Sequence, residues 1–291
     1  MVNMFNRIMM LASGLALVAA PMTAQDPQVI PIGLVESLVK DLSPGKRKIV
    51  ETDFPDMVKE FTGLSSKVEL GADPFTGAKK LASGDWRLGV FQGVEFAWAQ
   101  QQDSKLQPLM VAMGREKSIH AVLVAKSDSK ASGFADFKGK EISLLTGREH
   151  NRLFADKGAG GDASKFFAKV NPTSNSEMAL DDVLRGKVEA AIVDNSTMES
   201  YREIQPGRFK RLKVIAQSEP FPSSVIVYRQ GGLSDAVLEK FKTGMLKAND
   251  SDKGRDMMAN FNIVSFAAPP ADYAKQLEEI RKAYPAPKNG K

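Results

Sequence analysis

The sequence contains no cysteine, and this absence excludes several kinds of protein. A disulfide-stabilised scaffold and a thiolate metal site both require the missing thiol. An acylated N-terminal cysteine is excluded in the same way, so we do not expect a lipoprotein. The sequence therefore favours a protein whose stability comes from a packed core.

Histidine is nearly as scarce, since His120 and His150 are the only two. The sequence has no Gly-x-Ser-x-Gly, no His-Glu-x-x-His and no phosphate-binding loop ending in Gly-Lys-Ser/Thr. His120 lies in an apolar stretch, where we expect a structural role. We therefore predict no enzyme, no catalytic residues, no metal and no cofactor.

Long hydrophobic runs are absent after the first residues. Residues 1–24 carry Arg7 as their only charge, followed by a small, apolar run that is too short to span a bilayer. This pattern is typical of a secretory signal peptide, with cleavage after Ala24 or after Ala20. We therefore expect the mature protein in the periplasm.

The charge balance is only mildly basic. The chain has 40 basic and 35 acidic residues, and removing Arg7 with the signal lowers the net charge from +5 to +4. Such a balance weakly favours an anionic ligand. The basic cluster of Arg208, Lys210, Arg211 and Lys213 lacks interleaved aromatic residues, so we expect a solvated edge and no nucleic-acid partner.

A similar phrase occurs twice, at residues 81–93 and 184–195. Each copy is typical of a helix closed by a glycine, Gly84 or Gly186, and followed by a short buried strand. The two strands end on Gln92-Gly93 and on Asp194-Asn195. Ligands in open α/β sheets bind just beyond such strand ends, so these positions are candidate sites in two similar halves.

Strand and helix patterns alternate along the rest of the chain, which predicts an α/β fold with parallel sheets. Two β-branched runs, 119–125 and 224–228, flank a small α/β unit and are expected to be crossover strands between two lobes. We predict a discontinuous lobe 1 (25–125 and 223–291) and a continuous lobe 2 (126–222). Two crossings form a hinge, and the lobes enclose a cleft. Within lobe 2 we expect a helix over residues 162–170.

The phrases at 134–140 (FADFKGK) and 217–222 (QSEPFP), together with the signal and the repeats, resemble type II periplasmic solute-binding proteins. Within that group the chain is most similar to the phosphate, phosphite and phosphonate binders of ABC transporters, over about residues 30–284. The resemblance implies a two-lobe clamshell with two crossover strands. It also implies a monomer that passes a small anionic or zwitterionic solute to an ABC permease in the inner membrane. An extracytoplasmic sensor that presents its closed form to a membrane receptor is the alternative.

The resemblance further implies where ligand groups lie. They follow the first strand, the two repeat strands, and a helix start in the second lobe. In this sequence the corresponding residues are Glu36, Ser37, Phe91, Gln92, Gly93, Thr146, Gly147, Arg148, His150, Asp194 and Asn195.

The helix start in lobe 2 favours an oxyanion on chemical grounds as well. Thr146 and Gly147 follow a buried strand, where backbone amides, a hydroxyl and the helix dipole can face a bound oxygen. Arg148 could add a bidentate contact, and His150 a donor whose strength depends on pH. Alternatively, Thr146 only caps the helix and Arg148 pairs with Glu149 or solvent.

Two candidate carboxylates favour a ligand that also carries an amine. Glu36 and Asp194 would repel a doubly charged anion unless they accept a hydrogen bond from it. Asp194 could instead cap a helix that starts near Ser196, and Glu36 could be an exposed loop charge. Phe91 and nearby aromatic residues either line the cleft or belong to the core.

Overall fold

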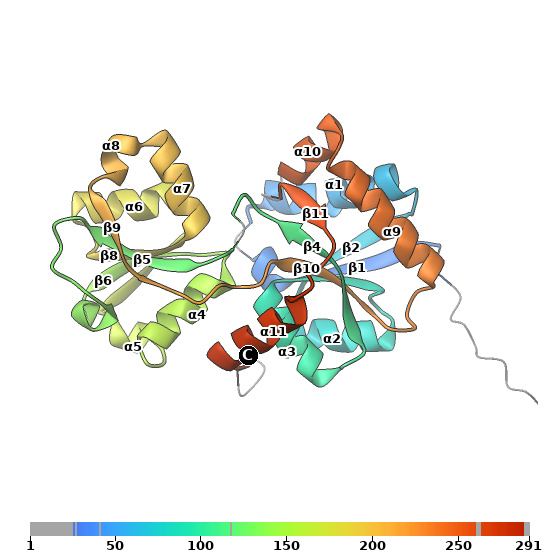
Figure 1. The fold of residues 1–291 in the computed structure, drawn as a ribbon, viewed down its shortest axis with the longest axis horizontal. Helices are drawn as coiled ribbons and strands as arrows, with labels where there is room; N and C mark the ends of the chain where they lie inside the picture. Colours follow the sequence, from blue (N-terminus) through green and yellow to red (C-terminus); the bar gives the residue numbers. More distant parts are fainter. Residues whose placement is uncertain (1–25, 27, 41, 117, 260–262, 288–291) are drawn as a thin grey trace, which may run out of the picture.

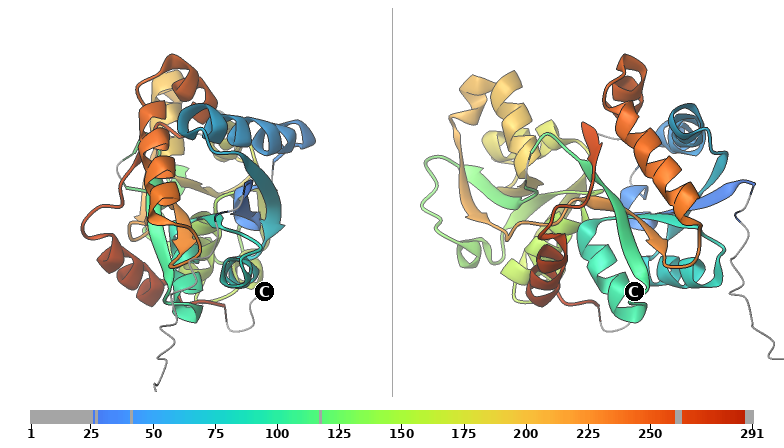
Figure 2. Two further views of the ribbon diagram at one scale, coloured as in Figure 1. Left: turned by 90° about the vertical axis from the view of Figure 1, so that its right-hand side faces the viewer. Right: turned by 45° about the vertical axis from the view of Figure 1, so that its right-hand side comes forward.

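The computed structural model describes residues 26, 28–40, 42–116, 118–259 and 263–287. The proposed signal peptide, residues 1–24, lies outside the described residues. Two bodies lie side by side along the long axis of the molecule (Figures 1 and 2). Among the described residues, none of the helices has the length and apolar character needed to cross a membrane.

A six-stranded sheet forms the centre of lobe 1, in the order β11-β4-β10-β3-β1-β2. Strands β1, β2 and β3 run parallel, and β10 is antiparallel to both of its neighbours. The strands are β1 (Ile30–Val35), β2 (Ser66–Ala72), β3 (Leu88–Phe91), β4 (Leu106–Met113), β10 (Ser224–Arg229) and β11 (Ser265–Ala267).

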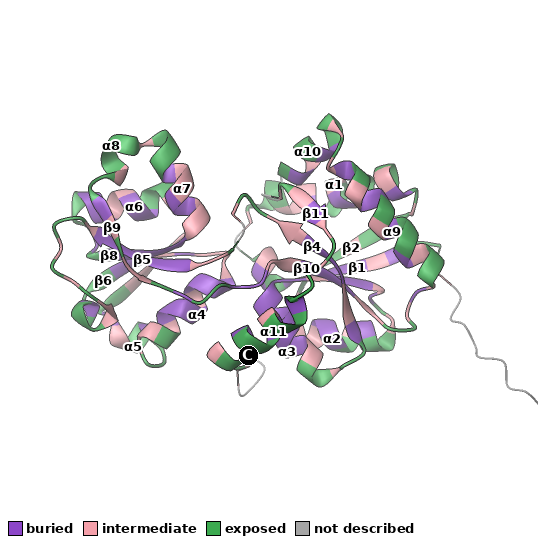
Figure 3. Cartoon of the chain, viewed as in Figure 1, coloured by how far each residue is buried: buried purple, intermediate pink, exposed green. Residues whose placement is uncertain are grey.

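Helices cover both faces of this sheet. One core cluster joins the sheet to α2, α3 and α11, and a second joins it to α1, α9 and α10. Figure 3 shows β1 largely buried inside the sheet and the outer faces of these helices exposed. The helices of lobe 1 are η1 (Glu36–Leu38), α1 (Pro44–Thr62), α2 (Pro74–Ser83), α3 (Gly93–Gln102), α9 (Asp235–Ala248), α10 (Asp252–Ala259) and α11 (Tyr273–Ala283).

Lobe 2 repeats this plan with a five-stranded sheet in the order β7-β6-β8-β5-β9. Its fourth strand, β5, is again antiparallel to both neighbours. The strands are β5 (Ala121–Lys126), β6 (Glu141–Leu145), β7 (Lys169–Thr173), β8 (Ala190–Asp194) and β9 (Leu212–Gln217). The helices are η2 (Phe134–Phe137), α4 (Glu149–Gly158), α5 (Ala163–Phe166), α6 (Ser176–Arg185), α7 (Asn195–Ile204) and α8 (Pro206–Phe209).

The repeated sequence phrase has a common structural cause. Gly84 ends α2 with φ 86°, and Gly186 ends α6 with φ 73°. Both angles lie in the left-handed region, which glycine adopts without a Cβ clash. Each helix then leads into a strand inside its sheet, β3, which is third from the β2 edge, or β8, which is third from the β7 edge. The prediction of an α/β protein with two similar halves is confirmed.

The hinge consists of the two chain segments that join β4 to β5 and β9 to β10 (Figure 1). They run antiparallel, and the amide of Phe221 donates to the carbonyl of Ile119 at 2.7 Å. Strand β5, expected at the end of lobe 1, pairs only within the sheet of lobe 2.

The prediction of a helix over residues 162–170 is wrong. Asp162 does cap a helix, but α5 ends at Phe166. Residues 169–173 form β7 and pair in parallel with β6. Pro172 is tolerated there because β7 is an edge strand, whose outer side needs no amide donor. Sheet pairing therefore outweighs the local helical pattern.

Candidate functional site

The candidate site lies between the lobes, where strand ends and helix starts face each other. A cavity of about 430 Å³ opens there. Its wall combines residues in and after η1, the starts of α2 and α3, the first turn of α4 and the C-terminal segment. The lining residues are Glu36, Ser37, Lys40, Asp73, Pro74, Phe75, Glu95, Trp98, Glu149, Arg152 and Pro287.

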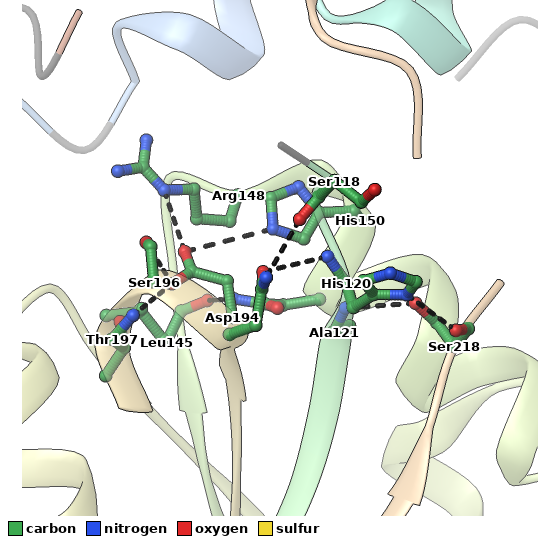
Figure 4. Close-up of polar contacts among 12 residues, drawn as sticks. Ser118, His120, Ala121, Leu145, Arg148, His150, Asp194, Ser196, Thr197 and Ser218 are labelled. Atoms are coloured by element: carbon green, nitrogen blue, oxygen red, sulfur yellow. Dashed lines mark hydrogen bonds and ion pairs between the residues drawn. The ribbon is translucent and has the colours of Figure 1, made fainter. Parts of the chain in front are cut away.

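Asp194 both caps a helix and pairs with an arginine (Figure 4). Its Oδ1 accepts from the Thr197 amide at 2.8 Å and from the Ser196 hydroxyl at 2.7 Å, so the capping interpretation is confirmed. Its Oδ2 accepts from Nε of Arg148 at 3.2 Å. Burial acts to raise the pKa of Asp194, but Arg148 and the hydrogen bonds outweigh it and hold the pKa below its usual value. Asp194 is therefore an ionised, fully engaged carboxylate.

The start of α4 is built differently from the expectation. Gly147 makes the turn with φ 71°, and the helix begins two residues later, after Arg148. Arg148 gives no side-chain cap to the first amides of α4. The amide and hydroxyl of Thr146 both donate to the carbonyl of Thr173, at 2.8 and 3.2 Å. Thr146 thus anchors the loop to β7 and does not cap α4.

His150 is the second residue of α4 and is buried, with 6 % of its surface exposed. Its Nε2 has no hydrogen-bond partner among the described residues and lies 3.9 Å from Oδ2 of Asp194. Burial lowers the pKa of His150 to about 4, more than Asp194 can offset, so the ring is neutral at pH 7. The ring also contacts Phe221 of the hinge, with centroids 5.4 Å apart.

The predicted lobe 1 residues lie in three places: the cavity wall, the core and the contact with the hinge. Glu36 and Ser37 line the cavity, with Glu36 exposed. Phe91 is fully buried in the core, so its side chain is not part of the cleft wall. Gly93 lies against the hinge, because a Cβ there would come within 2.4 Å of the Pro222 carbonyl oxygen. Gln92 is buried beside it, and its Nε2 has no partner among the described residues.

The side chain of Asn195, a predicted ligand contact, forms hydrogen bonds with the first hinge segment. Its side-chain amide donates to the Ser118 carbonyl at 2.8 Å and accepts from the His120 amide at 2.9 Å. His120 in turn has its Nδ1 3.0 Å from the Ser218 carbonyl, on the other hinge segment. Asn195 therefore holds the first crossing to the start of α7, and His120 joins the two crossings, which supports the structural role expected for His120.

Several cavity residues were not predicted. Glu95 is buried in the first turn of α3, and its Oε2 accepts from the Ser37 hydroxyl at 2.6 Å. Glu149 and Arg152 of α4 pair with each other, and Nζ of Lys40 lies 4.0 Å from Oε2 of Glu149, across the cleft. For Glu95 the available signal was a charged residue in the first turn of a helix that follows a repeat strand. Among the described residues, no group of three side chains could hold a metal ion.

Solved structures share this fold. A binding protein component of an ABC phosphonate transporter from Pseudomonas aeruginosa is similar over 88% of this chain and 87% of its own, with 19% identity and a TM-score of 0.60. PhnD1 from Prochlorococcus marinus, in complex with methylphosphonate, is similar over 89% and 98%, with 16% identity and a TM-score of 0.60. XAC2383 from Xanthomonas citri, bound to ATP, is similar over 89% and 97%, with 14% identity and a TM-score of 0.62.

Of the two sequence comparisons, only the one with family models gave a match. No curated protein sequence matches the chain significantly. The sequence model described as "ABC transporter, phosphonate, periplasmic substrate-binding protein" matches residues 52–273. That match spans most of the chain, including the hinge and every strand of the two sheets except β1. The chain therefore belongs to the family of periplasmic substrate-binding proteins of phosphonate ABC transporters.

Proposed function

We propose that this protein captures a small phosphonate-like anion or zwitterion between its lobes and delivers it to an ABC permease. It would work as a monomer, without chemical change to the solute, after export by residues 1–24. Family membership supports the transport role, and it does not favour the alternative of a receptor-linked sensor.

The observation that carries the proposal is the start of α4. Its first amides lack a side-chain cap, and the dipole of the helix adds partial positive charge there. The side chain of Arg148 is 41% exposed, and beyond its bond to Asp194 its terminal nitrogens point away from that carboxylate (Figure 4). Together these donors fit an oxyanion.

The opposite wall supports a solute that is more than a simple anion. Glu36 and Glu95 of lobe 1 both line the cavity. Carboxylates near a doubly charged oxyanion raise the free energy of its complex unless the solute brings a positive group. The two walls together therefore favour a zwitterion, with its acidic end at α4.

Closure of the lobes would follow from such a bridging ligand. A solute that contacts both walls binds the closed form more tightly than the open form, and this difference shifts the population. Small-angle scattering should then show a smaller radius of gyration with solute than without it.

The ligand class can be tested by a thermal-shift panel of phosphate, phosphite, ethylphosphonate, 2-aminoethylphosphonate and sulfate. A ligand at about 100 times its Kd should stabilise the folded protein by about 2.7 kcal/mol. Arg148→Gln should weaken the phosphonates that bind by about 1.5 to 3 kcal/mol, because a charged donor is lost. Arg211→Gln, an exposed arginine of lobe 2, is the matched control. No shift with any phosphonate, or equal losses in both variants, would overturn the proposal.

A further inference from the structure

Glu95 is a buried acid that the protein leaves without a counter-charge. Its residue surface is 3% exposed, yet it lines the interlobe cavity. The Ser37 hydroxyl donates to its Oε2 at 2.6 Å. No lysine or arginine of the described part of the chain lies within ion-pair distance of it. An ionised carboxylate in such a place is unfavourable until a positive group pairs with it.

The surrounding charges do not supply that group. The charged side chains that face the same cavity are Glu36 and Lys40 in and after η1, Asp73 at the start of α2, and Glu149 and Arg152 of α4. Both cations are engaged by Glu149, and Arg152 also pairs with Asp156. Asp73 caps α2 through its Oδ1. The charge of Lys40 lowers the pKa of Glu95, and Glu95 acts on Arg152 in turn, but neither cation forms an ion pair with Glu95.

The proton affinity of Glu95 reflects this setting. Burial is the main cause that raises its pKa, to about 7, and Glu149 from the opposite lobe adds to the effect. The hydrogen bond from Ser37 acts in the opposite direction. Glu95 therefore exchanges its proton near neutral pH.

We propose that Glu95 sets the charge selectivity of the cleft: its carboxylate receives a positively charged group of the solute and disfavours a solute that is only anionic. This inference rests on the proposed function. The rings of Phe75 and Trp98 line the same cavity, and aromatic rings suit an ammonium group. Because the ammonium stabilises the ionised carboxylate, binding releases the proton that Glu95 carries. A plain phosphonate releases none from this residue.

The test is isothermal titration calorimetry at pH 7 with 2-aminoethylphosphonate and ethylphosphonate, in two buffers of different ionisation enthalpy. The wild type should prefer the amino compound at least tenfold. Glu95→Gln should lower that preference at least tenfold, because a neutral amide cannot pair with an ammonium. The variant should also bind 2-aminoethylphosphonate without the additional proton release. The difference between the two proteins cancels the titration of the ligand itself. Glu51→Gln, on the exposed side of α1, should keep both properties.

A second variant leaves the acid in place. Ser37→Ala removes the donor to Glu95, so the proton release should move to higher pH while the amino compound remains preferred there. Equal preference in the wild type and Glu95→Gln, or the same loss in Glu51→Gln, would overturn the inference and leave the proposed function intact. If the wild type binds neither phosphonate, the proposed function fails and the inference fails with it.

Discussion

His150 should make the stability of the folded protein depend on pH in a defined window. Burial lowers its pKa from the usual 6.5 to about 4. Between these values the unfolded chain binds a proton that the folded protein does not bind, so the free energy of unfolding falls as the pH falls. The contribution of neutral His150 to the free energy of unfolding is fully present above pH 6.5. About 3 kcal/mol of this contribution should be lost by pH 4.

The perturbation is His150→Gln, which keeps a polar group but does not titrate. Urea unfolding followed by far-ultraviolet circular dichroism, at pH 7, 5 and 4, gives the free energy of unfolding of both proteins. Other titrating groups cancel in the difference between them. Relative to the wild type, the variant should gain about 3 kcal/mol between pH 7 and pH 4.

Proton magnetic resonance offers an independent check, because the sequence has only two histidines. The signal that disappears in His150→Gln should titrate near pH 4 in the folded wild type. A difference in stability that is the same at pH 7 and pH 4, or a titration near 6.5, would refute the reasoning.

Three further variants test other contacts. Asp194→Ala removes the cap of α7 and should lower the free energy of unfolding by about 1 to 2 kcal/mol in urea; an unchanged midpoint would contradict the capping role. Gly93→Ala places a Cβ within 2.4 Å of the Pro222 carbonyl oxygen and should lower the free energy of unfolding by about 1 to 3 kcal/mol. Gly207→Ala, which has open space around it, is the control and should change that free energy by no more than about 0.5 kcal/mol. Tyr284→Phe removes a 2.8 Å hydrogen bond to the hinge and should cost about 0.5 to 1.5 kcal/mol in calorimetry; no change in Tm would show that the contact is not stabilising.

Much of the fold could be predicted because its signals are local. Helix α2 was expected to end at Gly84, because a glycine after the last helical residue permits the left-handed cap. Helix α6 and strand β8 likewise follow the expectation for the second copy of the phrase, on either side of Gly186. Strand β7 and the short β11 were not predicted, because their pairing depends on partners distant in the sequence.

The site was less predictable, for a related reason. The sequence indicates which residues follow a strand, but not which way their side chains point. Phe91 and Asn195 both lie at the ends of repeat strands, as predicted. The side chain of Phe91 nevertheless enters the core, and that of Asn195 contacts the hinge. Glu95 was missed because its burial arises from contacts with η1 and with the opposite lobe. Asp194 caps α7, as one of the two interpretations of the sequence proposed, whereas its bond from Arg148 was not predicted.

The position of β10 between β3 and β4 has a consequence for the order in which the protein can fold. All five strands of lobe 2 lie within residues 121–217, so that lobe is complete before the end of the chain is made. Lobe 1 is split until residues 224–229 arrive, because β3 and β4 each pair with β10 and not with each other. Before then, both would expose an unpaired edge. We therefore expect the later-encoded lobe to fold first, and the N-terminal half to wait for its central strand.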